Sequence, residues 1–77
     1  MDKTKLTFGE RACGMTFNPG GNEDVAAIKS AYALIVDGLH QRREASFDPE
    51  VKRMLSIAIT ETQTAQMWAV KAATWNL

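Results

Sequence analysis

The sequence predicts an all-α fold: an antiparallel two-helix hairpin with a short N-terminal segment, in one domain of residues 1–77. Helix-start signals open two long stretches without a helix breaker, residues 23–45 and 49–75. Only a few residues connect them, and so short a connection makes the second helix run back along the first. The second stretch is apolar on almost every side, which predicts that hairpins assemble as a homo-oligomer.

The N-terminal segment, residues 1–22, is rich in turn residues. It holds four of the five glycines and one of the two prolines, and it shows no sustained helical period. In the stretch FNPGGN, Pro19 keeps Asn18 out of the helical region, and the glycine pair that follows permits positive φ. We therefore expect turns here, with room for one short helical turn around residues 9–13.

The first long helix is expected to begin after Asn22. This residue is a good N-cap, and Glu23 and Asp24 place negative charge in the first turn, where the helix dipole favours it. Apolar residues then recur at alternating spacings of three and four, which predicts a packed seam along one face. The expected seam consists of Val25, Ile28, Tyr32, Ile35 and Leu39.

The second helix is expected to begin with Asp48 as its cap and Pro49 at its first position, where the missing N–H is harmless. Its residues fall on three sides. A side of mainly small residues is expected to pack on the first helix: Val51, Leu55, Ala58, Thr62, Ala65, Ala69 and Ala72. A second side holds Met54, Ile57, Glu61, Thr64, Trp68, Lys71 and Trp75, and a third holds Ile59, Gln63, Met67 and Val70. One partner helix cannot cover all three sides, so other copies must.

Composition and motifs exclude several classes of function. Nine basic residues balance nine acidic ones, whereas a sequence-independent DNA binder needs a basic stripe, so no DNA partner is expected. No run of about 18 apolar residues could span a membrane. The single cysteine, Cys13, and the single histidine, His40, provide neither a disulfide nor a metal cluster. Because no catalytic motif is present, we expect no enzyme, no catalytic residue, no metal and no cofactor.

A group of aromatic, cationic and amide side chains suggests ligand binding. Aromatic rings stack on bases, arginine and lysine hold phosphates, and amides read base edges. The group consists of Phe8, Arg11, Met15, Phe17 and Asn18, followed by Lys29 and Tyr32 on the first helix. In the alternative interpretation, the apolar members form a lid on the open end of the hairpin and Arg11 is solvated. Composition alone favours the lid.

The order of the motifs resembles a known family. The stretches GER…FNPGGNEDVAAIKSAYALIVDGL and DPEVKRMLSIAITETQTAQMWAVKAATW are similar to small phage proteins that carry the anti-CBASS/anti-Thoeris hairpin domain. The resemblance covers residues 9–75 and is most specific in SIAITETQTAQMWAVKA. It implies a homohexamer that binds cyclic dinucleotides, cyclic trinucleotides or cyclic ADP-ribose variants without cleaving them. Such a sponge would act in the cytoplasm of the infected bacterial host, where it lets the phage evade CBASS or Thoeris defence.

The resemblance also implies a first set of site residues. Gly9, Glu10 and Arg11 stand where the family has a glycine, an aromatic residue and an arginine against the bound cyclic dinucleotide. Because Glu10 replaces the aromatic residue, Phe8 or Phe17 would have to supply the ring that stacks on the base.

Two further positions follow from the same resemblance. Lys29 matches a lysine of the family that contacts phosphate, and Thr60 matches the threonine of the second-helix motif. The residue before that threonine is Ile59, where the family's trinucleotide site uses an arginine, which weakens the case for such a site. The alternative function is a structural or regulatory helical-hairpin oligomer that recruits a protein partner.

Overall fold

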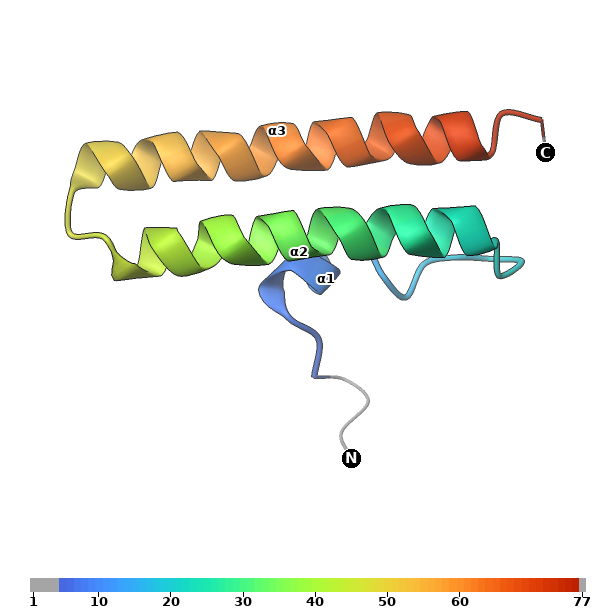
Figure 1. Cartoon of the computed structure of the whole chain (residues 1–77), viewed down its shortest axis with the longest axis horizontal. Helices are drawn as coiled ribbons and strands as arrows, with labels where there is room; N and C mark the ends of the chain where they lie inside the picture. The colour runs from blue at the N-terminus through green and yellow to red at the C-terminus, as the bar shows by residue number, and fades with distance from the viewer. Residues whose placement is uncertain (1–4, 77) are drawn as a thin grey trace.

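The computed structural model describes residues 5–76, so residues 1–4 and 77 of the expected domain lie outside it. It contains three helices, α1 (Phe8–Ala12), α2 (Glu23–Ala45) and α3 (Pro49–Ala73). Helices α2 and α3 lie side by side and run in opposite directions, and α1 lies against the middle of α2 (Figure 1). No strand occurs between residues 5 and 76, so the prediction of an all-α fold is confirmed there.

Local capping explains where the helices begin and end. Thr7 and Glu10 form a capping box, in which each side chain accepts the backbone N–H of the other, and this box starts the five-residue α1. Helix α2 has the expected bounds. Helix α3 ends at Ala73, two residues before the expected end, with Thr74 as its C-cap.

The packed face of α2 differs from the expected seam. Its buried residues are Val25, Lys29, Ala33 and Val36. Of the expected seam, Val25 is buried, and Tyr32 and Leu39 pack against the core. Ile35 is 52% exposed, so the prediction is correct only in part, and the packed face is turned by about one residue. The physical reason is that α2 packs against two neighbours rather than one. The small side chain of Ala33 lies where α1 approaches closely, and Val36 contacts the core beside it.

The packed face of α3 also differs from the expected one. Its buried residues are Ile59 and Gln66, whereas Ala65 and Ala72 of the expected small-residue side are exposed. Ile59 packs with Cys13, Ala33 and Val36 in the central cluster. Because α2 contributes the small residue to this contact, α3 contributes larger ones, and the helix is rotated relative to the prediction.

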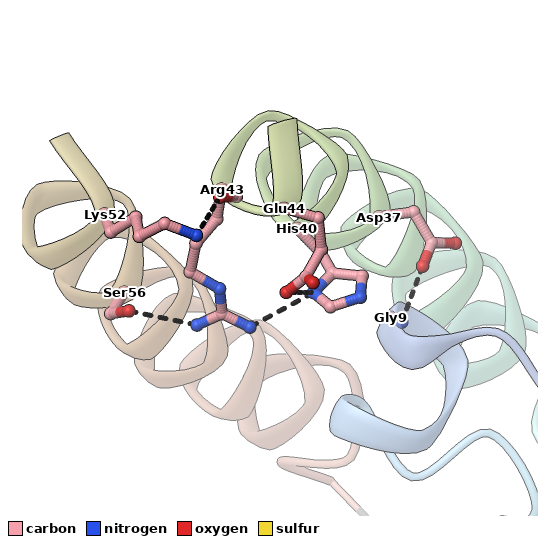
Figure 2. Close-up of polar contacts among 7 residues, drawn as sticks. All are labelled: Gly9, Asp37, His40, Arg43, Glu44, Lys52 and Ser56. Atoms are coloured by element: carbon pink, nitrogen blue, oxygen red, sulfur yellow. Dashed lines mark hydrogen bonds and ion pairs between the residues drawn. The ribbon is translucent and has the colours of Figure 1, made fainter. Parts of the chain in front are cut away.

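The hairpin end of the molecule is closed by polar contacts (Figure 2). The Arg43 guanidinium donates to Ser56 Oγ at 3.0 Å and lies 3.1 Å from His40 Nδ1. Lys52 Nζ donates to the Arg43 carbonyl oxygen at 3.0 Å. These bonds join the last turn of α2 to the first turns of α3 and fix the register of the hairpin.

The hairpin is only one helix layer thick. The molecule extends over 44 × 32 × 13 Å, and α2 and α3 lie side by side with no further long helix across them among residues 5–76 (Figure 1). Helix α3 therefore keeps an outer face, defined here as Met54, Ile57, Trp68 and Trp75, on which every residue is exposed and Trp68 is 66% exposed. No helix within residues 5–76 is long and apolar enough to cross a membrane.

Candidate ligand-binding site

The N-terminal segment is fixed on α2 by a close backbone contact. The Gly9 N–H donates to Asp37 Oδ1 at 2.6 Å (Figure 2). A Cβ atom at position 9 would overlap the carbonyl oxygen of Ala33 and would lie 2.9 Å from Asp37 Oδ1. Glycine is therefore required for α1 to dock, and Gly9 contributes to the site by positioning the residues that follow it.

Lys29 of α2 binds the loop that follows α1. Its ammonium donates to the carbonyl oxygen of Gly14 at 3.0 Å and to that of Phe17, and it lies 5.5 Å from the centre of the Phe17 ring. The residue is only 5% exposed. No carboxylate between residues 5 and 76 forms an ion pair with it, so a buried positive charge has only neutral partners within the chain.

Two of the hollows between the N-terminal segment and α3 border Arg11. The first, the Arg11–Phe17 groove, has a volume of about 450 Å³. Its lining includes Arg11, Phe17, Lys29, Gln66, Met67 and Val70. The second, the Phe8 recess, measures about 420 Å³ and is lined by Phe8, Arg11, Ala12 and Gln63. Arg11 borders both, and because its side chain is exposed, its guanidinium is available to an anion in either one.

Phe8 is fixed by a stack rather than by burial. Its ring lies parallel to the His40 ring, with centroids 4.1 Å apart and 7° between the planes, and the Arg43 guanidinium lies 5.4 Å from its centroid. The stack occupies one side of the ring, while the ring also lines the Phe8 recess. Phe8 can therefore offer a pre-oriented aromatic surface to a ligand.

The structure separates the remaining expected site residues. Glu10 belongs to the capping box, and the Asn18 side chain closes a loop by bonding both the N–H and the carbonyl oxygen of Asn22. Asn18 lines a hollow of about 250 Å³ that continues past Phe17 and Lys29. Tyr32 packs at the edge of the core, and Thr60 is exposed with its hydroxyl donating to the Ser56 carbonyl oxygen. Neither lines a hollow described above.

Two glutamines of α3 line the hollows, and neither was among the expected site residues. Gln63 donates its amide N–H to the Ala12 carbonyl oxygen at 3.3 Å, and Gln66 is buried beside the groove. They share the face of Ile59, at spacings of four and seven residues. That periodicity is the signal that could have placed them inward, had Ile59 been assigned to the packed face.

The Cys13 thiol is buried beside the site and is not activated as a nucleophile. Burial raises the pKa of the Cys13 thiol, and the Asp37 carboxylate raises it further, while Lys29 lowers it. The thiol lies in the core cluster and is therefore protonated and shielded at neutral pH. Within residues 5–76, no group of three histidine, cysteine, aspartate or glutamate side chains could hold a metal ion.

The geometry is that of a small helical hairpin domain, with a cation between two hollows and an aromatic ring in each. The sequence profile of the Acb2/Tad1 hairpin domain matches residues 11–74, which is most of the chain. The protein therefore belongs to this family, the phage anti-CBASS/anti-Thoeris sponges. The matched range begins at Arg11, so it excludes Phe8, Gly9 and Glu10. No curated protein and no solved structure matches the chain.

Proposed function

We propose that this protein binds cyclic nucleotide immune signals and sequesters them without cleavage, so that a phage escapes CBASS- or Thoeris-type defence. The observation that carries the proposal is the buried Lys29 ammonium without a counter-charge, beside the exposed cation of Arg11. A buried charge is costly unless an opposite charge compensates it, so the groove favours an anion such as a phosphodiester.

Each site residue has a role in this proposal. Arg11 and Lys29 hold phosphate, and the rings of Phe17 and Phe8 stack on bases. Three other residues shape the N-terminal segment that carries these groups: Gly9, Glu10 and Asn18. Tyr32 and Thr60 lie outside both hollows and have no ligand contact within one chain.

The proposed sponge is a homo-oligomer, with a hexamer as the expected form. The outer face of α3 supports this, because four large apolar residues lie exposed along one side of a helix whose other side is already packed. Between Trp68 and Trp75 the face also has a hollow of about 380 Å³ that another helix could fill. A sponge acts by mass action, so it must be abundant in the cytoplasm of the infected host.

Thermal unfolding in the presence of messengers tests the proposal. The panel contains cyclic dinucleotides, cyclic trinucleotides and cyclic ADP-ribose isomers. A ligand at a hundred times its dissociation constant stabilises the folded protein by about 2.7 kcal/mol, so the melting temperature should rise with at least one of them. Chromatography should recover that ligand unchanged. If no messenger raises the melting temperature, the protein-recruiting oligomer becomes the better explanation.

Lys29→Met should weaken binding of the stabilising messenger by about tenfold or more, because a hydrogen bond to a charged group contributes about 1.5–3 kcal/mol. Isothermal titration calorimetry measures the change, and native mass should show the same number of subunits. Lys52→Met is the matched control, since Lys52 also donates to a backbone carbonyl oxygen but lies at the hairpin end. Equal losses in both variants would contradict a role for Lys29 in the site.

A further inference from the structure

Gln66 is a buried residue whose side-chain amide has no hydrogen-bond partner among residues 5–76. It is 6% exposed, and none of the hydrogen bonds among residues 5–76 involves its side chain. Neither of its amide atoms is sealed from the surface, and the residue lines the Arg11–Phe17 groove. The amide therefore faces the groove and forms no hydrogen bond within the described chain, so packing alone gives no reason for a glutamine here.

The surroundings of Gln66 show what could use this amide. The same groove contains the Phe17 ring, which is a flat apolar surface, and the cations of Arg11 and Lys29. A nucleotide presents three matching features, namely a base face that stacks, a base edge that forms hydrogen bonds, and a phosphate. Gln66 is the member of the groove that supplies a neutral donor and acceptor together.

The Phe8 recess repeats this combination on the other side of Arg11. It contains a ring from Phe8 and an amide from Gln63, three residues before Gln66 on the same helix. The two amides differ in one respect. The Gln63 amide N–H is already bound to the Ala12 carbonyl oxygen, whereas both ends of the Gln66 amide remain available. Base discrimination should therefore be stronger in the Arg11–Phe17 groove than in the Phe8 recess.

We propose that Gln66 determines base specificity by reading the edge of an adenine that stacks on Phe17 while Arg11 holds the adjoining phosphate. This inference rests on the proposed function. A carboxamide offers one donor and one acceptor side by side. The N7 edge of adenine presents the matching pair, the acceptor N7 and the donor N6 amino group. The assignment therefore places the N7 edge of the base against Gln66. On that edge guanine presents two acceptors, O6 and N7, and satisfies only half of the amide.

Calorimetric titration with matched messengers tests this assignment. Cyclic di-AMP and cyclic di-GMP are compared first, followed by the adenine and guanine forms of any other messenger that binds. The wild-type protein should prefer the adenine form by about 10- to 100-fold, the discrimination that one two-bond amide–base pair provides. In Gln66→Met, which keeps the length but loses both hydrogen-bonding groups, the preference should fall to within a few-fold.

Stability separates base reading from a structural role. Because Gln66→Met removes no hydrogen bond within residues 5–76, the ligand-free variant should melt at the same or a higher temperature than the wild type. A structural glutamine would instead give a lower melting temperature with an unchanged adenine-to-guanine ratio. Gln41→Met is the matched control: it makes the same chemical change at an exposed position of α2, and should alter neither quantity.

The outcomes distinguish the inference from the proposed function. If the wild-type protein binds a messenger but prefers guanine, or if Gln66→Met keeps the adenine preference, the Gln66 assignment is wrong and the sponge proposal stands. If the wild-type protein binds no messenger of either base, the sponge proposal itself fails.

Discussion

The inner and outer faces of α3 have similar side chains and opposite environments. Ile59 on the inner face is 4% exposed, whereas Ile57, only two residues earlier, is 46% exposed on the outer face. The inner face packs on α2 and lines both ligand hollows through Gln63 and Gln66. The outer face, with Trp68 and Trp75, has no neighbour within the hairpin. The inner face of α3 is thus buried within the chain, whereas the outer face would be buried only by another copy.

We expect this division to separate the proposed ligand binding from the proposed assembly. The inner face, the N-terminal segment and α2 supply every group placed in the two hollows, and the outer face supplies none. Substitutions on the inner face should therefore affect ligand binding first, and substitutions on the outer face should affect assembly first. The predictions below use matched residues on the two sides.

The largest expected effect follows Ile59→Ala. It removes the largest side chain of the small central cluster and should cost about 2–5 kcal/mol of unfolding free energy, enough to unfold much of so small a domain. Ile57→Ala makes the same chemical change on the outer face. It should change the unfolding free energy of the isolated hairpin by less than about 0.5 kcal/mol and should weaken assembly instead.

Urea unfolding and sedimentation measured over a range of protein concentrations separate the two effects. The loss in Ile59→Ala should persist at every concentration, whereas the loss in Ile57→Ala should appear only where the wild-type protein is assembled. A concentration-independent loss in Ile57→Ala as large as that in Ile59→Ala would show that the two faces are not divided in this way.

The next effect concerns how the N-terminal segment docks on α2. Gly9→Ala places a Cβ against the Ala33 carbonyl oxygen, and overpacking of this kind costs about 1–3 kcal/mol. The segment should therefore lift from α2 while the α2–α3 hairpin remains folded. Cys13 reports this directly, because its thiol is 3% exposed in the docked segment. Its reaction with a thiol reagent should be faster in Gly9→Ala than in the wild type.

Gly38→Ala is the control for this change. A Cβ at position 38 would lie 3.5 Å from Arg42 Nη1, an ordinary contact, so the helix should gain up to about 1 kcal/mol from the better propensity of alanine. Its Cys13 should react as slowly as in the wild type. Equally slow reaction of Cys13 in Gly9→Ala would show that α1 tolerates a side chain at the contact.

The sequence predicted the bounds of the long helices much better than which of their faces are packed. The start of α2 at Asn22 and that of α3 at Asp48 depend on caps within a few residues, and both caps form as expected. The predicted end of α3 was two residues too late, because no glycine or proline marks the cap at Thr74 in the sequence. Local chemistry of this kind is largely readable from the sequence.

The orientation of each helix depends on a contact that is remote in the sequence. The approach of Gly9 to Ala33 bridges residues 24 positions apart and places α1 against α2, and no periodicity within α2 encodes it. The same contact explains why Ile35 is exposed although its spacing predicted burial. For the site, the composition suggested Arg11, Phe17 and Lys29, which do meet in one groove. It missed Gln66 because the inward face of α3 had been assigned to other residues.

The smallest expected effect is a pH dependence of the unfolding free energy, which arises from Cys13 in the core cluster. Burial raises the pKa of Cys13 above its ordinary value of 9.0, so the folded protein holds the thiol proton more tightly than the unfolded chain does. This contribution to stability is fully present below pH 9 and is lost as the pH rises through the raised pKa. Urea unfolding between pH 7 and pH 10.5 should show a steeper decline in the wild type than in Cys13→Ala. Trp68→Ala on the outer face should keep the wild-type slope when both proteins are compared as isolated hairpins. Parallel curves for the wild type and Cys13→Ala would mean that the thiol is as hydrated in the folded chain as in the unfolded one.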